Sequence, residues 1–255
     1  MIDIEHVCAG YDECEVLHDI NLKLERGKIT VLIGPNGCGK TTLLKTLIRL
    51  NHHTSGKIYI DGEDLEKLST TDIAQRMAYV SQNRKAPDIS VRRMVLHGRF
   101  AYLKYPRRYR SEDYLMADQA MEWVGIKELA ERNVGQLSGG TQQKVYIAMV
   151  LAQDTPVILM DEPTVFLDIS HQIRMMEMAK RLADQGKAVV MVLHDLVQTF
   201  QYADQIVVMK DGHIQMSGTP EDVYCSGLIE DVFDVTLKRI QSDQDFIYFV
   251  VKREK

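Results

Sequence analysis

A glycine-rich loop near the N-terminus has the residue types that chemistry on phosphates requires. Residues 34–42 read Gly-Pro-Asn-Gly-Cys-Gly-Lys-Thr-Thr and fit G-x-x-x-x-G-K-[ST], with apolar runs at 30–33 and 43–47 on either side. This order predicts a strand, a loop and a helix. Glycines let several backbone N–H groups turn toward one oxyanion, and the helix N-terminus adds partial positive charge. We therefore expect a nucleoside triphosphate site built from Gly34, Pro35, Asn36, Gly37, Cys38, Gly39, Lys40, Thr41 and Thr42.

Phosphoryl transfer also needs charged and metal-binding side chains, and these occur at the end of the loop and after a second apolar run. Lys40 would hold the β- and γ-phosphates, and the Thr41 hydroxyl is a ligand that Mg²⁺ accepts. An apolar run at 157–160 ends in Asp161 and Glu162, which is typical of a buried parallel strand. There Asp161 would hold Mg²⁺ through a water, and Glu162 would polarise the attacking water. An acidic turn without function is the alternative, and the Lys-Thr pair in the same chain disfavours it.

Two more polar side chains are expected at the same edge of the sheet. Gln82 follows a strand predicted at 77–80, and His194 follows a second apolar run at 188–193. Ligands of α/β sheets bind at the carboxyl ends of the strands. A lone histidine is more often structural, but its place at this edge favours a ligand contact, so we expect Gln82 to contact the ligand and His194 to contact the γ-phosphate.

A second helix N-terminus offers an anion site that lacks its own lysine. Ser138, Gly139 and Gly140 precede apolar residues that recur at helical spacing over 145–152. The backbone amides of such an N-terminus can bind an anion. Taken alone, the pattern more often indicates a helix cap.

The N-terminal segment predicts a small antiparallel β layer with an aromatic side chain at its edge. Strands are expected at 2–7 and 16–24, and Tyr11 follows Gly10 in the turn between them. From there its ring could lie on a purine face, and a purely structural tyrosine is equally consistent with the position.

Composition limits the class of protein. The 255 residues suffice for one large domain or for a domain with a subdomain. No apolar run is long enough for a membrane span and no secretory signal is present, so a soluble cytosolic chain is expected. The net charge of −5 argues weakly against a dedicated nucleic-acid binder. Neither a disulfide framework nor a zinc site is expected from the spacing of Cys8, Cys14, Cys38 and Cys225.

An inserted helical subdomain is predicted from about residue 83 to residue 133, where strand patterns give way to helical ones. It contains a basic and aromatic stretch whose composition is typical of nucleic-acid-binding surfaces. The acidic chain, and the tendency of Lys and Arg stems to lie over a surface, favour instead a protein docking surface or proximity to lipid headgroups. The stretch comprises Arg92, Arg93, Arg99, Phe100, Tyr102, Lys104, Tyr105, Arg107, Arg108, Tyr109 and Arg110.

Taken together, these motifs resemble the ATP-binding cassette (ABC) transporter ATPases over essentially the whole chain. The resemblance rests on the order of Tyr11, the loop at 34–41, Gln82, Leu137-Ser138-Gly139-Gly140, the run 157–162, Leu167-Asp168 and His194. It implies an α/β fold with a P-loop NTPase (RecA-like) core, an antiparallel β subdomain and an inserted α-helical subdomain. Residues 1–255 would then be one ABC ATPase domain, with the β subdomain and core at 1–82 and 155–255 and the helical subdomain at 83–154.

The resemblance also implies roles in the site. Tyr11 would stack on adenine, Gln82 and Thr41 would attend Mg²⁺ with Asp161, and Glu162 would be the catalytic base assisted by His194 and Gln82. Ser138, Gly139 and Gly140 would contact the nucleotide held by a second copy of the chain, with Asp168 lining the seam. Two ATP molecules would thus lie between two chains arranged head to tail.

Partners and cargo follow from the same resemblance. Residues 166–172, 192–196 and 202–204 look most like importer subunits that serve iron chelates such as ferric siderophores, and vitamin B12. Such a subunit would lie at the cytoplasmic face of the membrane, with the segment after Gln82 holding an integral-membrane permease and a substrate-binding protein acting indirectly. An ABC ATPase for another cargo, a soluble nucleic-acid-associated ABC ATPase, and a small-molecule kinase are the alternatives.

The sequence departs from the family pattern at a few positions. Thr141 stands where the family usually has Gln, Gln142 where Arg is common, and Val165 where the iron-chelate branch usually has Thr. We expect activity to survive these differences, with weaker closure of the dimer because Thr141 follows the Leu-Ser-Gly-Gly turn directly.

Overall fold

The structure is a computed structural model that describes residues 1–11, 14–81, 86–165, 167–241 and 246–253. The strands are β1 (Ile2–Tyr11), β2 (Cys14–Leu24), β3 (Ile29–Ile33), β4 (His53–Ile60), β5 (Glu63–Asp64), β6 (Met77–Val80), β7 (Val157–Asp161), β8 (Ala188–Val192), β9 (Gln205–Lys210), β10 (His213–Gly218), β11 (Val235–Gln241) and β12 (Phe246–Lys252). The α-helices are α1 (Lys40–Leu47), α2 (Thr70–Arg76), α3 (Val91–Leu96), α4 (Ser111–Trp123), α5 (Gly139–Gln153), α6 (Ile169–Asp184), α7 (Leu196–Tyr202), α8 (Pro220–Ser226) and α9 (Leu228–Phe233).

A six-stranded sheet forms the centre of the molecule, in the order β10-β9-β3-β8-β7-β6. All its pairings are parallel except that of the β9–β10 hairpin. β3, β7 and β8 are buried at every position, because both faces of the sheet are covered. These strands therefore read as continuous apolar runs in the sequence.

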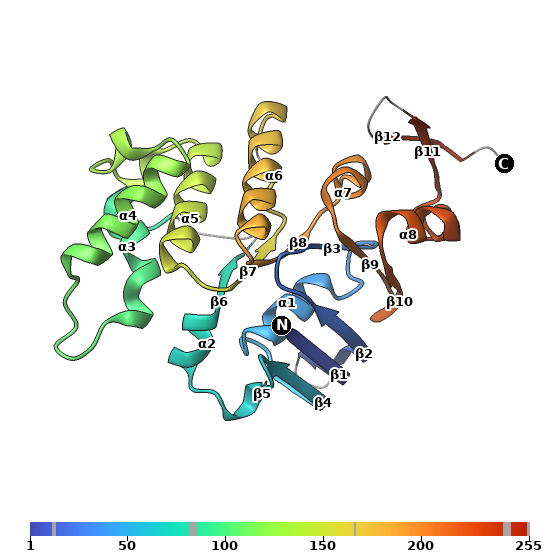
Figure 1. The fold of residues 1–255 in the computed structure, drawn as a ribbon, viewed down its shortest axis with the longest axis horizontal. Helices are drawn as coiled ribbons and strands as arrows, with labels where there is room; N and C mark the ends of the chain where they lie inside the picture. Colours follow the sequence, from blue (N-terminus) through green and yellow to red (C-terminus); the bar gives the residue numbers. More distant parts are fainter. Residues whose placement is uncertain (12–13, 82–85, 166, 242–245, 254–255) are drawn as a thin grey trace.

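The two faces of this sheet belong to separate hydrophobic cores, because successive side chains of a strand point to opposite sides. Leu32 packs with Leu43 and Leu44 of α1 and with the N-terminal β layer. Val31 packs on the other face with Met176 of α6 and other α6 and α7 residues. Figure 1 shows α6 and α7 on one side of the sheet and α1 with β1, β2 and β4 on the other.

The N-terminal β layer is a four-stranded sheet in the order β2-β1-β4-β5, antiparallel as predicted. Its extent differs from the prediction in one place. Beyond the strands predicted at 2–7 and 16–24, β4 begins at His53, where His53 pairs with Ala9 and Ser55 with Cys8. Buried backbone groups need partners, and β4 supplies them to β1 as far as Ala9, whereas Gly10 and Tyr11 pair with β2.

The helical insertion follows β6 and forms a third hydrophobic core. α3, α4 and α5 pack around Val91, Val95, Met121, Val145 and Ala148. Short 3-10 helices at His97–Tyr102, Lys127–Leu129 and Val134–Gln136 connect these elements. Gly98 allows the first of them to approach α5, because a Cβ there would lie 2.1 Å from the Met149 carbonyl oxygen.

The C-terminal part continues from β10 into α8, α9 and the β11–β12 hairpin. Thr219 caps α8 through a reciprocal capping box with Asp222. Tyr248 of β12 packs against Phe200 of α7, with ring centroids 5.1 Å apart. Among the described residues, we find no helix whose length and apolar character would let it span a membrane.

Candidate active site

The phosphate loop connects β3 to α1 in a conformation that requires its glycines. Gly34, Gly37 and Gly39 have φ angles of 153°, 81° and 103°, which residues with a Cβ rarely adopt. A Cβ on Gly34 would also lie 2.1 Å from the Met209 carbonyl oxygen. The loop therefore keeps its backbone close to β9 on one side and free to face a ligand on the other.

Lys40 begins α1 and folds back over this loop. Its side chain is buried, and Nζ donates to the carbonyl oxygens of Gly34 at 2.7 Å and Pro35 at 2.9 Å. The Cys38 sulfur lies 3.7 Å from the same ammonium group. The loop and the helix N-terminus thus carry a fixed positive charge, which favours binding of a phosphate.

Asp161 and Glu162 stand together at the end of β7 but in different environments. The buried Asp161 carboxylate accepts hydrogen bonds from the hydroxyls of Thr41 at 3.1 Å and Tyr79 at 3.3 Å. Burial raises the pKa of the Asp161 carboxyl above its ordinary value, although these two hydroxyls oppose the shift. Glu162 has a φ of 51°, a left-handed conformation that non-glycine residues adopt rarely and often at functional sites.

His194 follows β8 and contacts Glu162, with Nε2 and Oε1 2.6 Å apart. Because β3, β8 and β7 are neighbours in the sheet, their carboxyl ends bring the loop, the histidine and the two carboxylates to one edge. This is the edge to which the sequence assigned them. A pocket of about 390 Å³, which we name the phosphate pocket, is lined by Asn36, Gly37, Gly39, Lys40, Thr41, Thr42, Glu162 and His194.

One predicted site residue, Tyr11, does not line this pocket, and another, Gln82, is not described. Tyr11 ends β1 with 42% of its side chain exposed, and the Lys45 Nζ lies 5.8 Å from the centroid of its ring. Because β1 is an inner strand of the β layer, Tyr11 stands at a strand end, beside the connection to β2, and does not line the phosphate pocket. Gln82 lies outside the described residues, which stop at Ser81 after β6.

Ser138 caps α5 and lines a second pocket. Its Oγ accepts a hydrogen bond from the Thr141 backbone N–H at 3.4 Å and lies 2.9 Å from the Thr141 hydroxyl. Gly139 begins the helix. This Ser138 pocket, of about 340 Å³, is lined by Ser138, Gly140, Thr141, Lys144, Leu167, Asp168 and His171. It shares no lining residue with the phosphate pocket, so Ser138 does not complete that pocket within its own chain.

The charges in the Ser138 pocket differ from the expectation in one respect. A site without a lysine was predicted, but Lys144 lines the pocket, because residues three to four positions apart share a face of α5. Asp168 caps α6 opposite it and accepts hydrogen bonds from the His171 backbone N–H at 2.9 Å and from the Ser170 hydroxyl at 2.9 Å. These bonds, with the His171 ring, lower the pKa of the Asp168 carboxyl to about 2.

Glutamine side chains connect the two pockets, and the sequence reasoning missed them. Gln143 of α5 donates to the Pro163 carbonyl at 2.8 Å, directly after Glu162. Gln172 of α6 donates to the Leu167 carbonyl at 3.1 Å, and its own Oε1 accepts from Gln198 of α7 at 2.8 Å. No local pattern signals these contacts, because each joins elements that are distant in the sequence.

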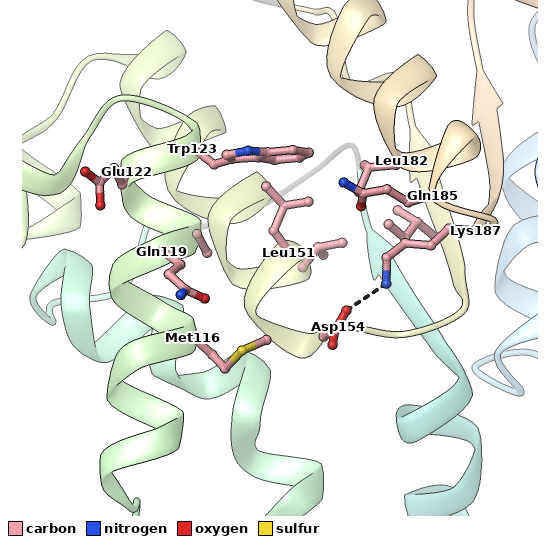
Figure 2. A pocket seen from close by; sticks show the side chains of 12 residues that line it. Met116, Gln119, Glu122, Trp123, Leu151, Asp154, Leu182, Gln185 and Lys187 are labelled. Atoms are coloured by element: carbon pink, nitrogen blue, oxygen red, sulfur yellow. Dashed lines mark hydrogen bonds and ion pairs between the residues drawn. The ribbon is translucent and has the colours of Figure 1, made fainter.

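A third cavity, the Trp123 groove, lies between the helical insertion and the core. It measures about 440 Å³ and opens beside Trp123, which is 45% exposed. Figure 2 shows α4 side chains on one wall, with Lys187 and Asp154 joined by an ion pair on the other side; their Nζ and Oδ1 are 2.7 Å apart. The residues that line it include Met116, Gln119, Glu122, Trp123, Leu151, Asp154, Leu182, Gln185 and Lys187.

The fold and the phosphate pocket define a P-loop nucleotide-hydrolysing protein, with a phosphate loop, an Asp-Glu pair and a histidine at one sheet edge. The chain belongs to the ABC transporter family, because the family model for the ABC transporter matches residues 17–165. It therefore binds nucleotide and is an ATPase, as the sequence predicted.

Similar proteins extend this match to the whole chain. The chain is 37% identical to the iron(3+)-hydroxamate import ATP-binding protein FhuC of Bacillus subtilis, covering 100% of this chain and 97% of that protein. It is 39% identical to the ferric enterobactin transport ATP-binding protein FepC of Escherichia coli, over 90% of this chain and 85% of that one. A metal-chelate type ABC transporter solved in an inward-facing conformation matches with a TM-score of 0.84 at 27% identity, covering 100% and 98% of the two chains. The resemblance and the fold class predicted from the sequence are confirmed.

Proposed function

We propose that this chain is the ATP-hydrolysing subunit of an importer of iron chelates, and that it works as a head-to-tail pair at the cytoplasmic face of the membrane. The observation that carries the pairing is the separation of the phosphate pocket from the Ser138 pocket within one chain. A helix N-terminus with Ser138 and Lys144 suits a phosphate that only a second chain can supply. The cargo class rests on the similarity to FhuC and FepC.

Hydrolysis follows from the side chains of the phosphate pocket. The loop amides and Lys40 hold the phosphates, and the charge of Lys40 offsets the charge that develops on the leaving ADP. Glu162 accepts a proton from the attacking water. The oxygen of that water bonds to the γ-phosphorus while the bond between the γ-phosphorus and the leaving ADP breaks. His194 orients that carboxylate, because its Nε2 lies 2.6 Å from the Glu162 Oε1. It lines the phosphate pocket, where it would contact the γ-phosphate.

Magnesium fits the residues beside the loop. Thr41 and Asp161 present only oxygen atoms, 3.1 Å apart, and such ligands suit Mg²⁺ together with phosphate oxygens and water. Thr41 would bind the ion directly and Asp161 through a water, with Gln82 as a further ligand. The ion would supply charge neutralisation of the β- and γ-phosphates.

A permease is the partner that the Trp123 groove suits best. The groove combines apolar side chains such as Leu151 and Leu182 with an exposed aromatic side chain, Trp123, which are features of protein-binding pockets. It lies between the helical subdomain, which we assign to 83–154, and the core formed by 1–82 and 155–255. A permease helix bound there would move when the helical subdomain rotates against the core. Closure of the ATP-bound pair would therefore move the membrane-embedded permease.

The test is ATP-dependent pairing of a variant that cannot hydrolyse. We expect Glu162→Gln to be monomeric without nucleotide and dimeric with ATP and Mg²⁺ in the presence of the permease, as measured by light scattering, because it binds ATP but lacks the base. Ser138→Ala in the Glu162→Gln background should weaken that dimer, whereas Ser226→Ala, on the distant α8, should not. A Glu162→Gln protein that stays monomeric under these conditions would contradict the proposal.

A further inference from the structure

Residues 99–110, which we name the basic–aromatic loop, contain positive and aromatic side chains and no carboxylate. They include the 3-10 helix residues from Arg99 to Tyr102 and the connection to α4. Because the chain as a whole has a net charge of −5, this loop is a local exception to its acidic character.

Part of this charge has a structural role. Arg99 is half-buried and pairs with Asp113, with Nε and Oδ1 3.1 Å apart. Its guanidinium also donates to the Ala152 carbonyl at 3.0 Å and lies 4.1 Å from the centroid of the Tyr102 ring. Arg99 therefore fastens the base of the loop to α4 and α5 and is not available to a partner.

The other basic side chains of the loop are exposed, and among the described residues no carboxylate pairs with three of them. Lys104, Arg107 and Arg108 are exposed and, within the described part of the chain, take part in no ion pair. Arg107 lies 4.8 Å from the centroid of the half-exposed Phe100 ring. Tyr105 is 97% exposed, so no other residue covers its ring. Basic side chains around an uncovered tyrosine are the composition of a segment that lies at a membrane interface.

The position of the loop relative to the Trp123 groove supports a membrane partner. The loop leads into the N-terminus of α4, and Trp123 at the other end of that helix lines the groove. Arg99 donates to the carbonyls of Ala152 and Gln153, directly before Asp154 of the groove. In Figure 1 the loop lies at the outer edge of the helical insertion, away from the central sheet. A permease seated in the groove would bring the bilayer surface close to this edge.

We propose that the basic–aromatic loop binds the anionic headgroups of the phospholipid bilayer, with Lys104, Arg107 and Arg108 as the charge contacts and Tyr105 as the interfacial anchor. The inference rests on the proposed function, because it is the permease in the Trp123 groove that would bring the bilayer close to the loop. A lipid surface is favoured over a protein because residues 99–110 contain no carboxylate and cluster three exposed cations around an uncovered tyrosine, and a bilayer with anionic headgroups needs only clustered charge and an amphipathic ring.

The direct test is binding of the full chain, without permease, to vesicles. We expect co-sedimentation with vesicles of phosphatidylglycerol mixed with phosphatidylcholine, weaker binding at high salt, and none to phosphatidylcholine alone. Because each basic residue near an anionic surface changes partitioning roughly fivefold, Arg107→Ala/Arg108→Ala should lower the partition coefficient about thirtyfold. Tyr105→Ala should lower it at high and low salt alike.

The matched control is Lys57→Ala/Lys67→Ala, which makes the same change of net charge at two exposed residues of the N-terminal β layer and its edge. It should bind vesicles as the unchanged protein does. Equal binding by the loop variant and this control would overturn the proposal. So would an Arg107→Ala/Arg108→Ala protein that binds vesicles normally but no longer binds the permease in detergent, because the loop would then be a protein contact. Neither result bears on ATP-dependent pairing of Glu162→Gln.

Discussion

At the turn before α5, the Ser138 hydroxyl is engaged by the residue that departs from the family pattern. Thr141 approaches it twice, with its hydroxyl at 2.9 Å and its backbone N–H at 3.4 Å. In the proposed pair, the Ser138 hydroxyl must turn to the γ-phosphate on the other chain. The Thr141 hydroxyl competes for it, at a strength of about 1 kcal/mol for an ordinary hydrogen bond.

Replacing Thr141 should therefore strengthen the pair. We expect Thr141→Gln to raise ATP-dependent dimerisation in the Glu162→Gln background about fivefold, since it removes the competing hydroxyl. Thr141→Val keeps the shape of the side chain without its hydroxyl and should give a similar gain. Dimer dissociation constants from analytical ultracentrifugation would measure both. If neither variant differs from its parent, the departure at Thr141 is neutral.

At the scale of elements, the turn after β7 is held by α5 and α6, and α6 is linked in turn to α7. Gln143 joins it to α5, Gln172 joins it to α6, and Gln198 links α6 to α7, the helix that follows His194. The strained Glu162 backbone begins this turn, and Asp168 of the Ser138 pocket ends it. A movement at the Ser138 pocket would therefore reach Glu162, the proposed base, through these amide contacts.

Gln172→Leu should uncouple these parts. The variant leaves the Leu167 carbonyl without its partner, so Glu162 is held less well, and we expect kcat to fall roughly tenfold while KM for ATP stays near its original value. Gln201→Leu, on the exposed side of α7, is the matched control and should retain kcat. A lower melting temperature with an unchanged kcat would show that Gln172 supports only the fold.

Local patterns were enough for several elements and for the phosphate pocket. The start of α2 is marked by a local pattern, the capping box of Ser69 and Asp72. β6 ends at Val80 as predicted, since an apolar run between polar residues marks its limits. The start of β4 at His53, the glutamine contacts and Lys144 in the Ser138 pocket were missed, because they depend on which distant strand or helix lies alongside.

At the scale of the whole molecule, the Trp123 groove marks the boundary between two separately packed parts. The helical insertion has its own core, distinct from those on the two faces of the central sheet. Figure 2 shows side chains from both parts facing the groove. Asp154, which follows α5, and Lys187, which precedes β8, form an ion pair there. Interfaces of this kind allow one part to rotate against another more easily than a continuous core does.

Trp123→Ala tests whether this boundary receives the permease. Removing a large aromatic side chain from the centre of a protein interface costs about 2 kcal/mol, so affinity for the permease should fall roughly thirtyfold. Basal ATPase should persist, because Trp123 lines neither the phosphate pocket nor the Ser138 pocket. Binding would be measured in detergent, which removes any contribution from a bilayer.

Tyr114→Ala is the matched control for this prediction. Tyr114 lies on the same helix and is 44% exposed, against 45% for Trp123, but it does not line the groove. It should bind the permease with nearly unchanged affinity. Equal loss in both variants would indicate a general effect on α4, and no loss in Trp123→Ala would place the permease on another surface. A loss confined to Trp123→Ala, with hydrolysis retained, is the result expected if the groove couples ATP-driven closure to transport.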